Sequence, residues 1–221
     1  MSNPYYQQDG ITIYHGDCRE LLAELPSVEL VLTDPPYGIG ACSTGSMGGG
    51  VLAKQSQFKA TDWDGAPPDR ELLDAVIAKG AHACLWGGNY FGLPASSCWL
   101  LWDKDNGGND FADAEMAWTN LPGAVRLIKH RWQGMLQENM KNKEARVHPT
   151  QKPLQLMEWC ILQADKKLGK KPMTILDPFC GSGTTLVAAK QLRRQAIGIE
   201  LEERYCEVAA SRLSQGVLEL A

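Results

Sequence analysis

A continuous apolar run, Val28 to Thr33 (V-E-L-V-L-T), leads without a break into the tetrapeptide Asp34-Pro35-Pro36-Tyr37. Such a run is typical of a parallel strand buried on both faces, and it restricts the chain to α/β folds. In open α/β sheets, ligands bind at the carboxyl ends of the strands. The tetrapeptide offers acceptors and a flat ring there, which suits a planar ligand carrying an amino group. The alternative is a plain strand end followed by a proline turn.

A second predicted strand runs into a glycine-rich loop. Met173 to Leu176 is predicted to be a strand, residues 177–185 (D-P-F-C-G-S-G-T-T) a loop, and Leu186 to Arg194 a helix. This order forms a nucleotide-type site, because glycines let a ligand approach the backbone and the helix start presents free N–H groups. We expect Gly183 to allow that approach, since a Cβ there would intrude on the ligand or strain the loop.

The strand predicted after this helix ends in a carboxylate. It covers Gln195 to Ile199 and is followed by Glu200, 23 residues beyond Asp177. This is about the spacing at which a carboxylate binds ribose hydroxyls. A dinucleotide fingerprint would need a third glycine where Leu186 stands. The site is therefore predicted to bind a nucleoside with a charged tail, and a nicotinamide-dependent oxidoreductase is the less favoured alternative.

Together, the two motifs resemble those of the amino-methylating DNA methyltransferases that use S-adenosylmethionine. Residues 34–37 resemble their catalytic D-P-P-Y motif, and residues 177–185 resemble their cofactor loop. His148 to Pro153 (H-P-T-Q-K-P) resembles the cofactor-side motif that precedes the cofactor strand. The catalytic motif comes first, which is the order of the circularly permuted β group of bacterial or phage enzymes. Looser agreement is found in residues 86–89, 102–104 and 115–118.

The resemblance covers nearly the whole chain and implies its fold. The expected fold class is α/β: a Rossmann-like methyltransferase fold, circularly permuted, whose mostly parallel sheet has helices on both faces. One domain is expected over residues 1–221, with the catalytic motif at 34–37. A short target-recognition insertion is expected at about 104–147, and the cofactor-binding part at 148–221. Because the insertion is short, we expect a short or loosely selected DNA site.

The resemblance also implies the residues of the site. The catalytic residues are Asp34, Pro35, Pro36 and Tyr37. The cofactor-binding residues are Asp17, Cys18, Asp34, Thr150, Lys152, Asp177, Phe179, Gly181, Ser182, Gly183, Thr184, Thr185 and Glu200. Asp17 is expected at the adenine ring of the cofactor, Glu200 at the ribose, and Asp177 with the loop at the methionine end. Thr150 and Lys152 are placed for the cofactor's tail, although an exposed lysine without a role is the simpler explanation of Lys152.

The implied chemistry follows from the amino group. An exocyclic amino nitrogen is a poor nucleophile because its lone pair is delocalised into the ring. Hydrogen bonds to Asp34 and to the Pro35 carbonyl would free that pair and stabilise charge in the transition state. The sulfonium methyl is already activated, so neither a metal nor a covalent cysteine is expected. In duplex DNA the base must be flipped out, and Tyr37 would then hold its face.

Adenine is the expected target base. Asp begins the catalytic motif here, whereas Ser is commoner in the cytosine-amino enzymes of the group. Cytosine-N4 methylation is the close alternative, and RNA methylation is a more distant one. A catalytically inactive DNA-binding relative would need a damaged site, but residues 34–37 are intact.

Positive charge is concentrated in one segment. The formal net charge is −4, yet residues 126–152 hold seven Lys and Arg against two acids, a net +5. Such a segment can follow a phosphate backbone, the alternative being a solvated loop. The candidate DNA-binding residues are Arg126, Lys129, Arg131, Lys141, Lys143 and Arg146. Trp132, within the basic segment, supports this interpretation.

Two other features are expected near the DNA. Trp63 is the expected surface aromatic. The glycine-rich residues 38–50 are expected to form a loop that could close over the target base.

Other properties bound the environment of the protein. Seven scattered cysteines without Cys-x-x-Cys spacing predict reduced thiols. No run of about 18 apolar residues occurs, and the N-terminus lacks a signal-peptide pattern, so no membrane span is expected. We expect a protein of the cytoplasm, in a bacterial cell or a phage-infected host. The expected partners are double-stranded DNA and a second copy of the chain, because dimers are frequent in this group.

The remaining elements are predicted from apolar patterning. The expected strands are Ile11–Tyr14, Ala83–Trp86, Trp99–Trp102 and Ala114–Thr119, and the expected helices are Arg19–Leu25, Asp69–Lys79, Leu154–Lys166 and Glu203–Leu213. The chain contains no internal repeat.

Overall fold

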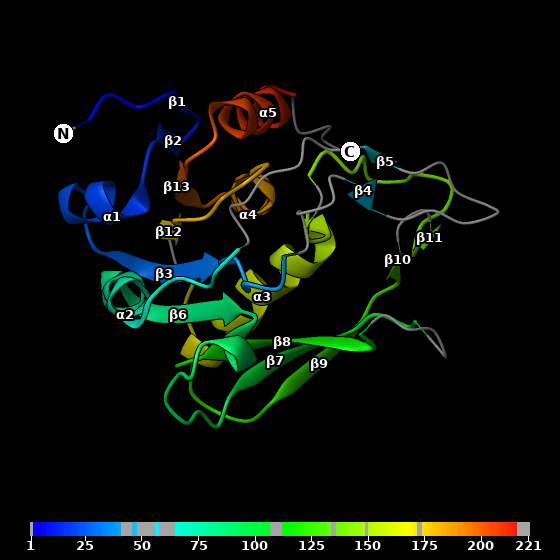
Figure 1. Ribbon diagram of the computed structural model, residues 1–221. Coiled ribbons are helices and arrows are strands. Elements are labelled where there is room, and N and C mark those ends of the chain that lie inside the picture. Colours follow the sequence, from blue (N-terminus) through cyan, green and yellow to red (C-terminus); the bar gives the residue numbers. More distant parts are fainter. Residues whose placement is uncertain are drawn as a thin grey trace.

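A computed structural model describes residues 2–40, 46–47, 56–57, 65–106, 112–133, 136–148, 150–171 and 174–215. A nine-stranded sheet with the order β1-β2-β13-β12-β3-β6-β8-β7-β9 crosses the molecule (Figure 1). Its strands are β1 (Tyr6–Gln8), β2 (Ile11–His15), β3 (Val28–Thr33), β6 (Gly80–Trp86), β7 (Trp99–Asp103), β8 (Ala114–Thr119), β9 (Arg126–Lys129), β12 (Thr174–Asp177) and β13 (Gln195–Glu200).

The sheet is mixed and mostly parallel. Strands β2, β13, β12, β3 and β6 run parallel to one another, and β7 runs parallel to β9. Antiparallel pairs join β1 to β2, β6 to β8 and β8 to β7. The predicted α/β fold with a mostly parallel sheet is therefore confirmed.

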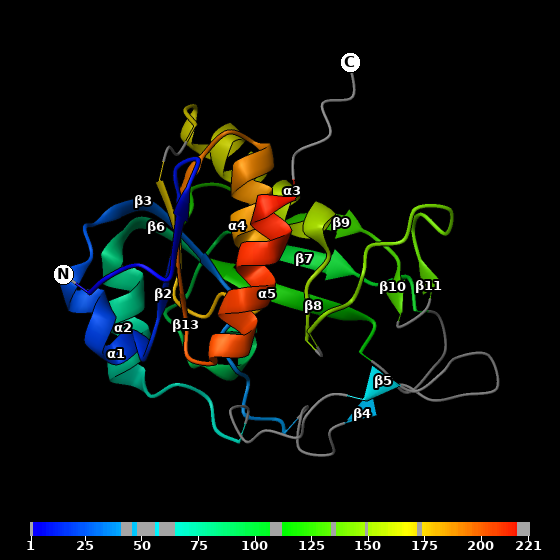
Figure 2. The same ribbon diagram turned by 90° about the horizontal axis from the view of Figure 1, so that it is seen from above.

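Helices cover both faces of the sheet, as the view from above shows (Figure 2). The helices are α1 (Cys18–Leu21), α2 (Arg70–Lys79), α3 (Leu154–Leu168), α4 (Thr184–Gln191) and α5 (Glu203–Ser214), with 3-10 turns η1 (Leu22–Glu24) and η2 (Gly88–Tyr90). One buried cluster joins α3, α4 and α5 to the sheet, and a second joins α1, η1 and α2 to its other face. Burial of these two apolar clusters provides the main stabilisation of the fold.

Local sequence signals explain several of these boundaries. The Asp69 carboxylate accepts a hydrogen bond from the Leu72 backbone N–H at 2.8 Å, so Asp69 is the N-cap of α2. Strands β3 and β8 have the predicted bounds. Helix α4 begins at Thr184, two residues earlier than predicted, because Gly183 takes a left-handed conformation (φ +79°) and ends the loop there. The helix predicted from Arg19 to Leu25 is a single α-helical turn followed by η1.

The segment predicted as the target-recognition insertion, residues 104–147, contributes strands to the main sheet. Strands β8 and β9 fall inside that range but belong to the main sheet. The part that leaves the sheet includes a small antiparallel pair, β10 (Trp132–Gln133) and β11 (Leu136–Gln137). Strands β1, β9, β10 and β11 were not predicted; each is two to four residues long.

Most of the glycine-rich segment, residues 41–45 and 48–50, lies outside the described residues, and so does Trp63. Two short strands beside them, β4 (Ser46–Met47) and β5 (Ser56–Gln57), pair antiparallel. Within the described ranges, no helix combines the length and the apolar character needed to cross a membrane.

Candidate active site

A cavity of about 310 Å³ opens at the carboxyl ends of β3, β12 and β13. Leu176 of β12 is opposite Val31 of β3, which brings Asp177 and Asp34 to the same edge of the sheet. Most of the predicted site residues line this cavity: Asp17, Cys18, Asp34, Pro36, Thr150, Lys152, Asp177, Phe179, Gly181, Ser182, Thr184, Thr185 and Glu200. Pro35, Tyr37 and Gly183 do not line it.

Asp177 is a buried carboxylate at the floor of the cavity. The Thr33 hydroxyl donates to its Oδ1 at 2.6 Å, and the Phe179 backbone N–H donates to the same oxygen at 3.2 Å. Burial nevertheless raises the pKa of Asp177 to about 6, since these hydrogen bonds only partly compensate for lost hydration. A cation bound beside it would restore the usual preference for the ionised form.

Glu200 is held by backbone amides. The N–H of Gly181 donates to its Oε2 and the N–H of Glu202 donates to its Oε1, both at 2.8 Å. Burial raises its pKa. Each oxygen retains a lone pair, so the carboxylate can still accept hydrogen bonds from hydroxyl groups in the cavity.

Gly183 is packed against α5. A Cβ built on Gly183 would lie 2.7 Å from the Ala209 Cβ of that helix. The glycine is required for its positive φ and for close packing of the loop on α5. The expected strain on the loop is thus present, while an effect of the glycine on cofactor binding stays a prediction.

Arg212 of α5 binds the same loop and was not predicted. Its Nη1 donates to the Ser182 carbonyl at 2.7 Å, to the Ser182 hydroxyl at 3.2 Å and to the Thr184 hydroxyl at 3.1 Å. Its Nη2 pairs with Glu144 at 3.2 Å. Both hydroxyls that were expected to bind the cofactor are thus also structural groups of the loop.

Asp17 and Cys18 begin α1 at the rim of the cavity. Asp17 is the N-cap of the helix, and its carboxylate accepts from the Arg19 N–H at 2.8 Å. The Cys18 thiol is buried, and burial raises its pKa to about 11, so it stays a neutral, unreactive wall group.

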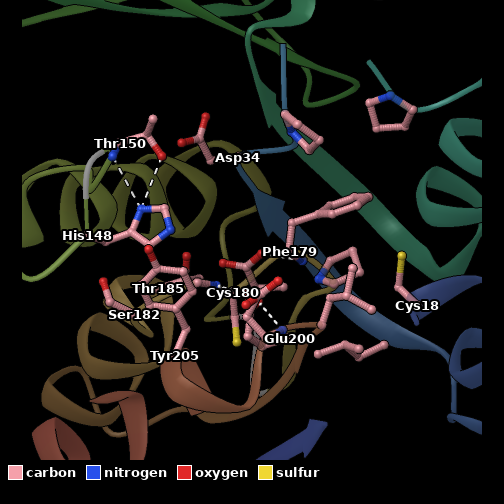
Figure 3. A pocket seen from close by; sticks show the side chains of 18 of the residues that line it. Cys18, Asp34, His148, Thr150, Phe179, Cys180, Ser182, Thr185, Glu200 and Tyr205 are labelled. Atoms are coloured by element: carbon pink, nitrogen blue, oxygen red, sulfur yellow. Dashed lines mark hydrogen bonds between the residues drawn. The ribbon is translucent and has the colours of Figure 1, made fainter. Parts of the chain in front are cut away.

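His148 connects the H-P-T-Q-K-P segment to α5. Figure 3 shows its ring between Thr150 and Tyr205. Its Nδ1 lies 3.3 Å from the Thr150 backbone nitrogen and 3.2 Å from the Thr150 hydroxyl. Its ring contacts the Tyr205 ring edge-on, with the two ring centroids 4.3 Å apart. Burial lowers the pKa of His148 to about 3, so the ring is neutral. The motif was identified in the sequence, but His148 and Tyr205 were not assigned to the site.

Asp34 and Tyr37 contact each other directly. The Tyr37 hydroxyl donates to Asp34 Oδ1 at 2.6 Å. The Tyr37 ring stacks on Tyr90 with centroids 5.1 Å apart and an interplanar angle of 18°. A Cβ on Gly87 (φ +70°) would lie 2.1 Å from Tyr37 Cε1, so only glycine fits beside this ring. Because Tyr90 already covers one face of Tyr37, the predicted base-stacking role of Tyr37 is limited to whatever surface remains.

Lys152 is not the exposed lysine considered above. The residue is 7% exposed, and its Nζ lies 2.7 Å from Asp34 Oδ2 and 3.1 Å from Glu115 Oε2. Glu115 also pairs with Lys104. Glu115 was not predicted as a site residue, although it lies in one of the stretches that agree loosely with the family, residues 115–118.

The candidate DNA-binding residues do not form one surface. Lys129 lies 2.6 Å from Asp105, and Arg131 pairs with the same carboxylate. Arg126 begins β9, which runs in the same direction as β3, so it lies at the sheet edge opposite the cavity. Trp132 is 8% exposed and packs in the core, so it cannot support DNA binding as predicted.

The remaining candidates follow β11. Lys141 and Lys143 are exposed, while Arg146 is half-buried. Glu144, between them, turns inward and accepts from the Leu154 backbone N–H at 2.9 Å and from Gln151 at 2.8 Å. This part of the basic segment is therefore anchored to the start of α3 and presents its two lysines to solvent.

Comparisons with known proteins agree with this geometry. The family N6_N4_Mtase, described as DNA methylase, matches residues 86–211. The type II methyltransferase M2.LlaDCHI of Lactococcus lactis subsp. cremoris is 27% identical over 263 residues, covering 98% of this chain and 94% of that protein. The type II methyltransferase M2.DpnII of Streptococcus pneumoniae is 27% identical over 260 residues, covering 96% and 93%.

Two solved structures share the fold. The M1.HpyAVI–SAM complex superimposes with a TM-score of 0.55 at 24% identity, covering 92% of this chain and 99% of the other. The PvuII DNA methyltransferase, named as cytosine-N4-specific, superimposes with a TM-score of 0.58 at 18% identity, covering 99% and 90%. Both likenesses support the Rossmann-like methyltransferase architecture.

Proposed function

Because the chain belongs to the N6_N4_Mtase family of DNA methylases, we propose that it transfers a methyl group from S-adenosylmethionine to the N6 amino group of adenine in double-stranded DNA. The observation that carries the choice of adenine is Asp34, a carboxylate at the cavity wall and the first residue of the D-P-P-Y motif. Cytosine N4 is the second candidate base, since the family includes amino-methylating enzymes of both kinds.

The cavity suits S-adenosylmethionine as the cofactor. A volume of about 310 Å³ lies within the range of small-molecule sites. We assign Glu200 to the ribose hydroxyls and Asp177 to the methionine ammonium group, because both carboxylates line the cavity. Asp17 lies at the rim, and Leu72 and Ile199 offer apolar contacts to an adenine ring. When bound, the cofactor supplies a methyl group that its sulfonium charge has activated.

The residues of the tetrapeptide act on the substrate's amino group. Asp34 and the Pro35 carbonyl accept its two N–H bonds, which localises the nitrogen lone pair and stabilises the positive charge of the transition state. The Tyr37 hydroxyl orients Asp34 from the other side. For the amino group to reach Asp34, the base must leave the duplex stack.

Product analysis tests the proposed function. Duplex DNA containing all four bases is incubated with the protein and S-adenosylmethionine, digested to nucleosides and analysed by mass spectrometry. We expect N6-methyladenine. N4-methylcytosine would establish cytosine as the target base. Methylated nucleosides from an RNA substrate would change the substrate class from DNA to RNA. If neither substrate gives a methylated nucleoside, the proposal is contradicted.

Cofactor binding is expected to depend on pH through Asp177. Its raised pKa, about 6, means that the carboxylate is ionised above this pH and neutral below it. Only the ionised form attracts the ammonium group, so the Kd for S-adenosylmethionine should be about 10-fold higher at pH 5 than at pH 8, where nearly every chain is competent. Calorimetric titrations across this range measure it. Asp177→Asn should remove the dependence; an unchanged dependence in that variant would assign it to another group.

DNA binding is expected to use the two exposed lysines. Replacing Lys141 and Lys143 together with alanine should reduce the slope of log Kd against log salt by up to about 1.8, because each neutralised phosphate contributes about 0.9. Arg126→Ala is the matched control, since Arg126 is exposed on the opposite edge of the sheet. A change of slope in the control but not in the double variant would place the DNA on the other edge.

The proposal extends to the organisation of the protein. We treat residues 1–221 as one methyltransferase domain, with residues 148–221 as the cofactor-binding part. The described segment after β9, residues 130–133 and 136–147, takes the place of the longer target-recognition insertion. We place the protein in the cytoplasm, in a bacterial cell or a phage-infected host, and a homodimer is its proposed assembly.

A further inference from the structure

We propose that Lys152 is a positioning residue for Asp34: its ammonium group holds the Asp34 carboxylate ionised and oriented toward the substrate's amino group, instead of binding the tail of the cofactor. This assignment rests on the proposed function for its effect on catalysis. It replaces the role in cofactor binding that the H-P-T-Q-K-P motif suggests for this lysine.

The three donors of the Lys152 ammonium group are all used inside the protein. Its Nζ lies 2.7 Å from Asp34 Oδ2, 3.1 Å from Glu115 Oε2 and 3.1 Å from the Tyr37 hydroxyl oxygen. A lysine ammonium has three N–H bonds and no acceptor. With three acceptors already in place, no donor remains for a carboxylate of the cofactor.

Lys152 belongs to a chain of alternating charges. Lys104 pairs with Glu115, Glu115 with Lys152, and Lys152 with Asp34. The four side chains are between 8% and 21% exposed, and they come from four separate segments: the ends of β7 and β3, strand β8 and the loop before α3. Because two positive and two negative groups alternate, the cluster is neutral as a whole.

Electrostatics explain why Asp34 needs this partner. Burial raises the pKa of Asp34, the Lys152 charge lowers it, and the Glu115 charge raises it again. Burial alone would lower the pKa of Lys152, but Asp34 and Glu115 raise it to about 12, so the lysine stays charged at neutral pH. Among the other groups that face Asp34, the Tyr37 hydroxyl donates to it, and Asp177 interacts with it as a second carboxyl group.

The hydrogen bonds around Asp34 also fix the orientation of its carboxylate group. Tyr37 accepts from Lys152 and donates to Asp34 Oδ1, while Lys152 donates to Oδ2. Each carboxylate oxygen is thereby held by one donor and keeps a lone pair for the substrate. Loss of Lys152 would release one oxygen and remove the nearest positive charge, whereas loss of Glu115 would remove a negative charge and leave Lys152 in place.

The test uses these opposite signs. In Lys152→Met, the acid limb of the kcat–pH profile should move to higher pH, and kcat at pH 7 should fall by about 10-fold or more, the effect of losing one adjacent opposite charge. In Glu115→Gln, the acid limb should move to lower pH. Lys152→Arg should retain the position of the limb, and Lys170→Met, which breaks a surface pair with Glu29, is the matched control.

Saturating S-adenosylmethionine and DNA are used, so that the titration of Asp177 acts on binding and does not enter kcat. The Kd for S-adenosylmethionine, measured by calorimetry, should be nearly the same in all four variants and the wild type. A raised Kd in Lys152→Met with an unmoved limb would return Lys152 to the cofactor's tail. Loss of kcat at every pH in both Lys152→Met and Glu115→Gln, with no displacement of the limb, would reduce the cluster to a structural role.

A second readout does not depend on activity. Carbon-13 labelling of aspartate side chains, with Asp34→Asn to assign the signal, follows the ionisation of Asp34 by NMR in the protein alone. The Asp34 titration should shift upward in Lys152→Met and downward in Glu115→Gln, and unshifted titrations would overturn the proposal. If the wild type methylates no DNA but these titrations move as expected, the proposed function fails and the role of Lys152 stands. If Lys152→Met does not fold, the Glu115→Gln titration decides.

Discussion

Replacing Asp34 with asparagine should lower kcat by at least about 100-fold, the scale for losing one group that hydrogen-bonds in the transition state. The Asp34 carboxylate lies at the cavity wall with both oxygens held by Tyr37 and Lys152. Asparagine keeps the shape of the side chain and one acceptor oxygen but has no charge, so the positive charge that develops on the substrate's amino group loses its stabilising carboxylate. Turnover is measured by transfer of a labelled methyl group, and S-adenosylmethionine affinity by calorimetry should change little.

Asparagine tests the catalytic role of Asp34 more selectively than alanine does, because alanine also lowers the stability of the fold. Asp34→Ala should also lower kcat at least about 100-fold, but it leaves the buried Lys152 short of a partner, at a cost of about 3–5 kcal/mol of stability. Asp165→Asn is the control, because Asp165 pairs with Arg194 at 3.1 Å in an equally buried place outside the cavity. Its folded form should keep near-normal kcat. Near-normal kcat in Asp34→Asn would exclude the mechanism.

Gly183→Val should destabilise the fold by about 2–5 kcal/mol. A left-handed conformation costs a residue with a Cβ about 1–2 kcal/mol, and overpacking adds about 1–3 kcal/mol. Here φ is +79° and the added Cβ would lie 2.7 Å from that of Ala209. Urea denaturation measures the loss, and S-adenosylmethionine affinity of the remaining folded protein should be close to that of the wild type.

Two further variants separate strain from collision. Gly169→Ala sits at a similar φ of +63° with no atom within 4 Å of the added Cβ, so it should show the strain alone. Gly183→Ala alone should lose stability through both strain and overpacking. Adding Ala209→Gly to it should recover the part of the lost stability that comes from overpacking against Ala209. A Gly183→Val protein of normal stability that fails to bind S-adenosylmethionine would restore the original interpretation of this glycine.

Local patterns predicted the fold well where the signal lay within a few residues. Strand β3 has the predicted bounds because a run with four apolar residues in six ends just before Asp34 and a proline pair. Helix α2 was found because Asp69 caps it and an apolar face follows. The start of α4 was placed late because Thr184 and Thr185 were assigned to the loop motif, although they form the first turn of the helix. Strand β9 was missed because its four residues show no clear alternation of burial.

The site was predictable in its motifs but not in its partnerships. Asp34, Asp177 and Glu200 reach one cavity because parallel strands end at one edge, which sequence patterns can predict. The burial of Lys152 depends on Asp34, 118 residues away, and on Glu115 of another strand. Gly183 likewise meets a residue of α5. Contacts of this kind are set by tertiary packing, so composition and spacing carry no signal for them.

The order of the strands has a consequence for how this chain is synthesised. Strands β12 and β13 follow every other strand of the sheet in the sequence, yet they fill the two positions between β2 and β3. A nascent chain that ends before β12 therefore has β2 and β3 without the neighbours that pair with them, and open strand edges invite wrong pairing. Because synthesis proceeds from the N-terminus, these two gaps in the sheet can be filled only after β12 and β13 have been made. Until then, the facing edges of β2 and β3 are the places where this chain is most exposed to wrong strand pairing.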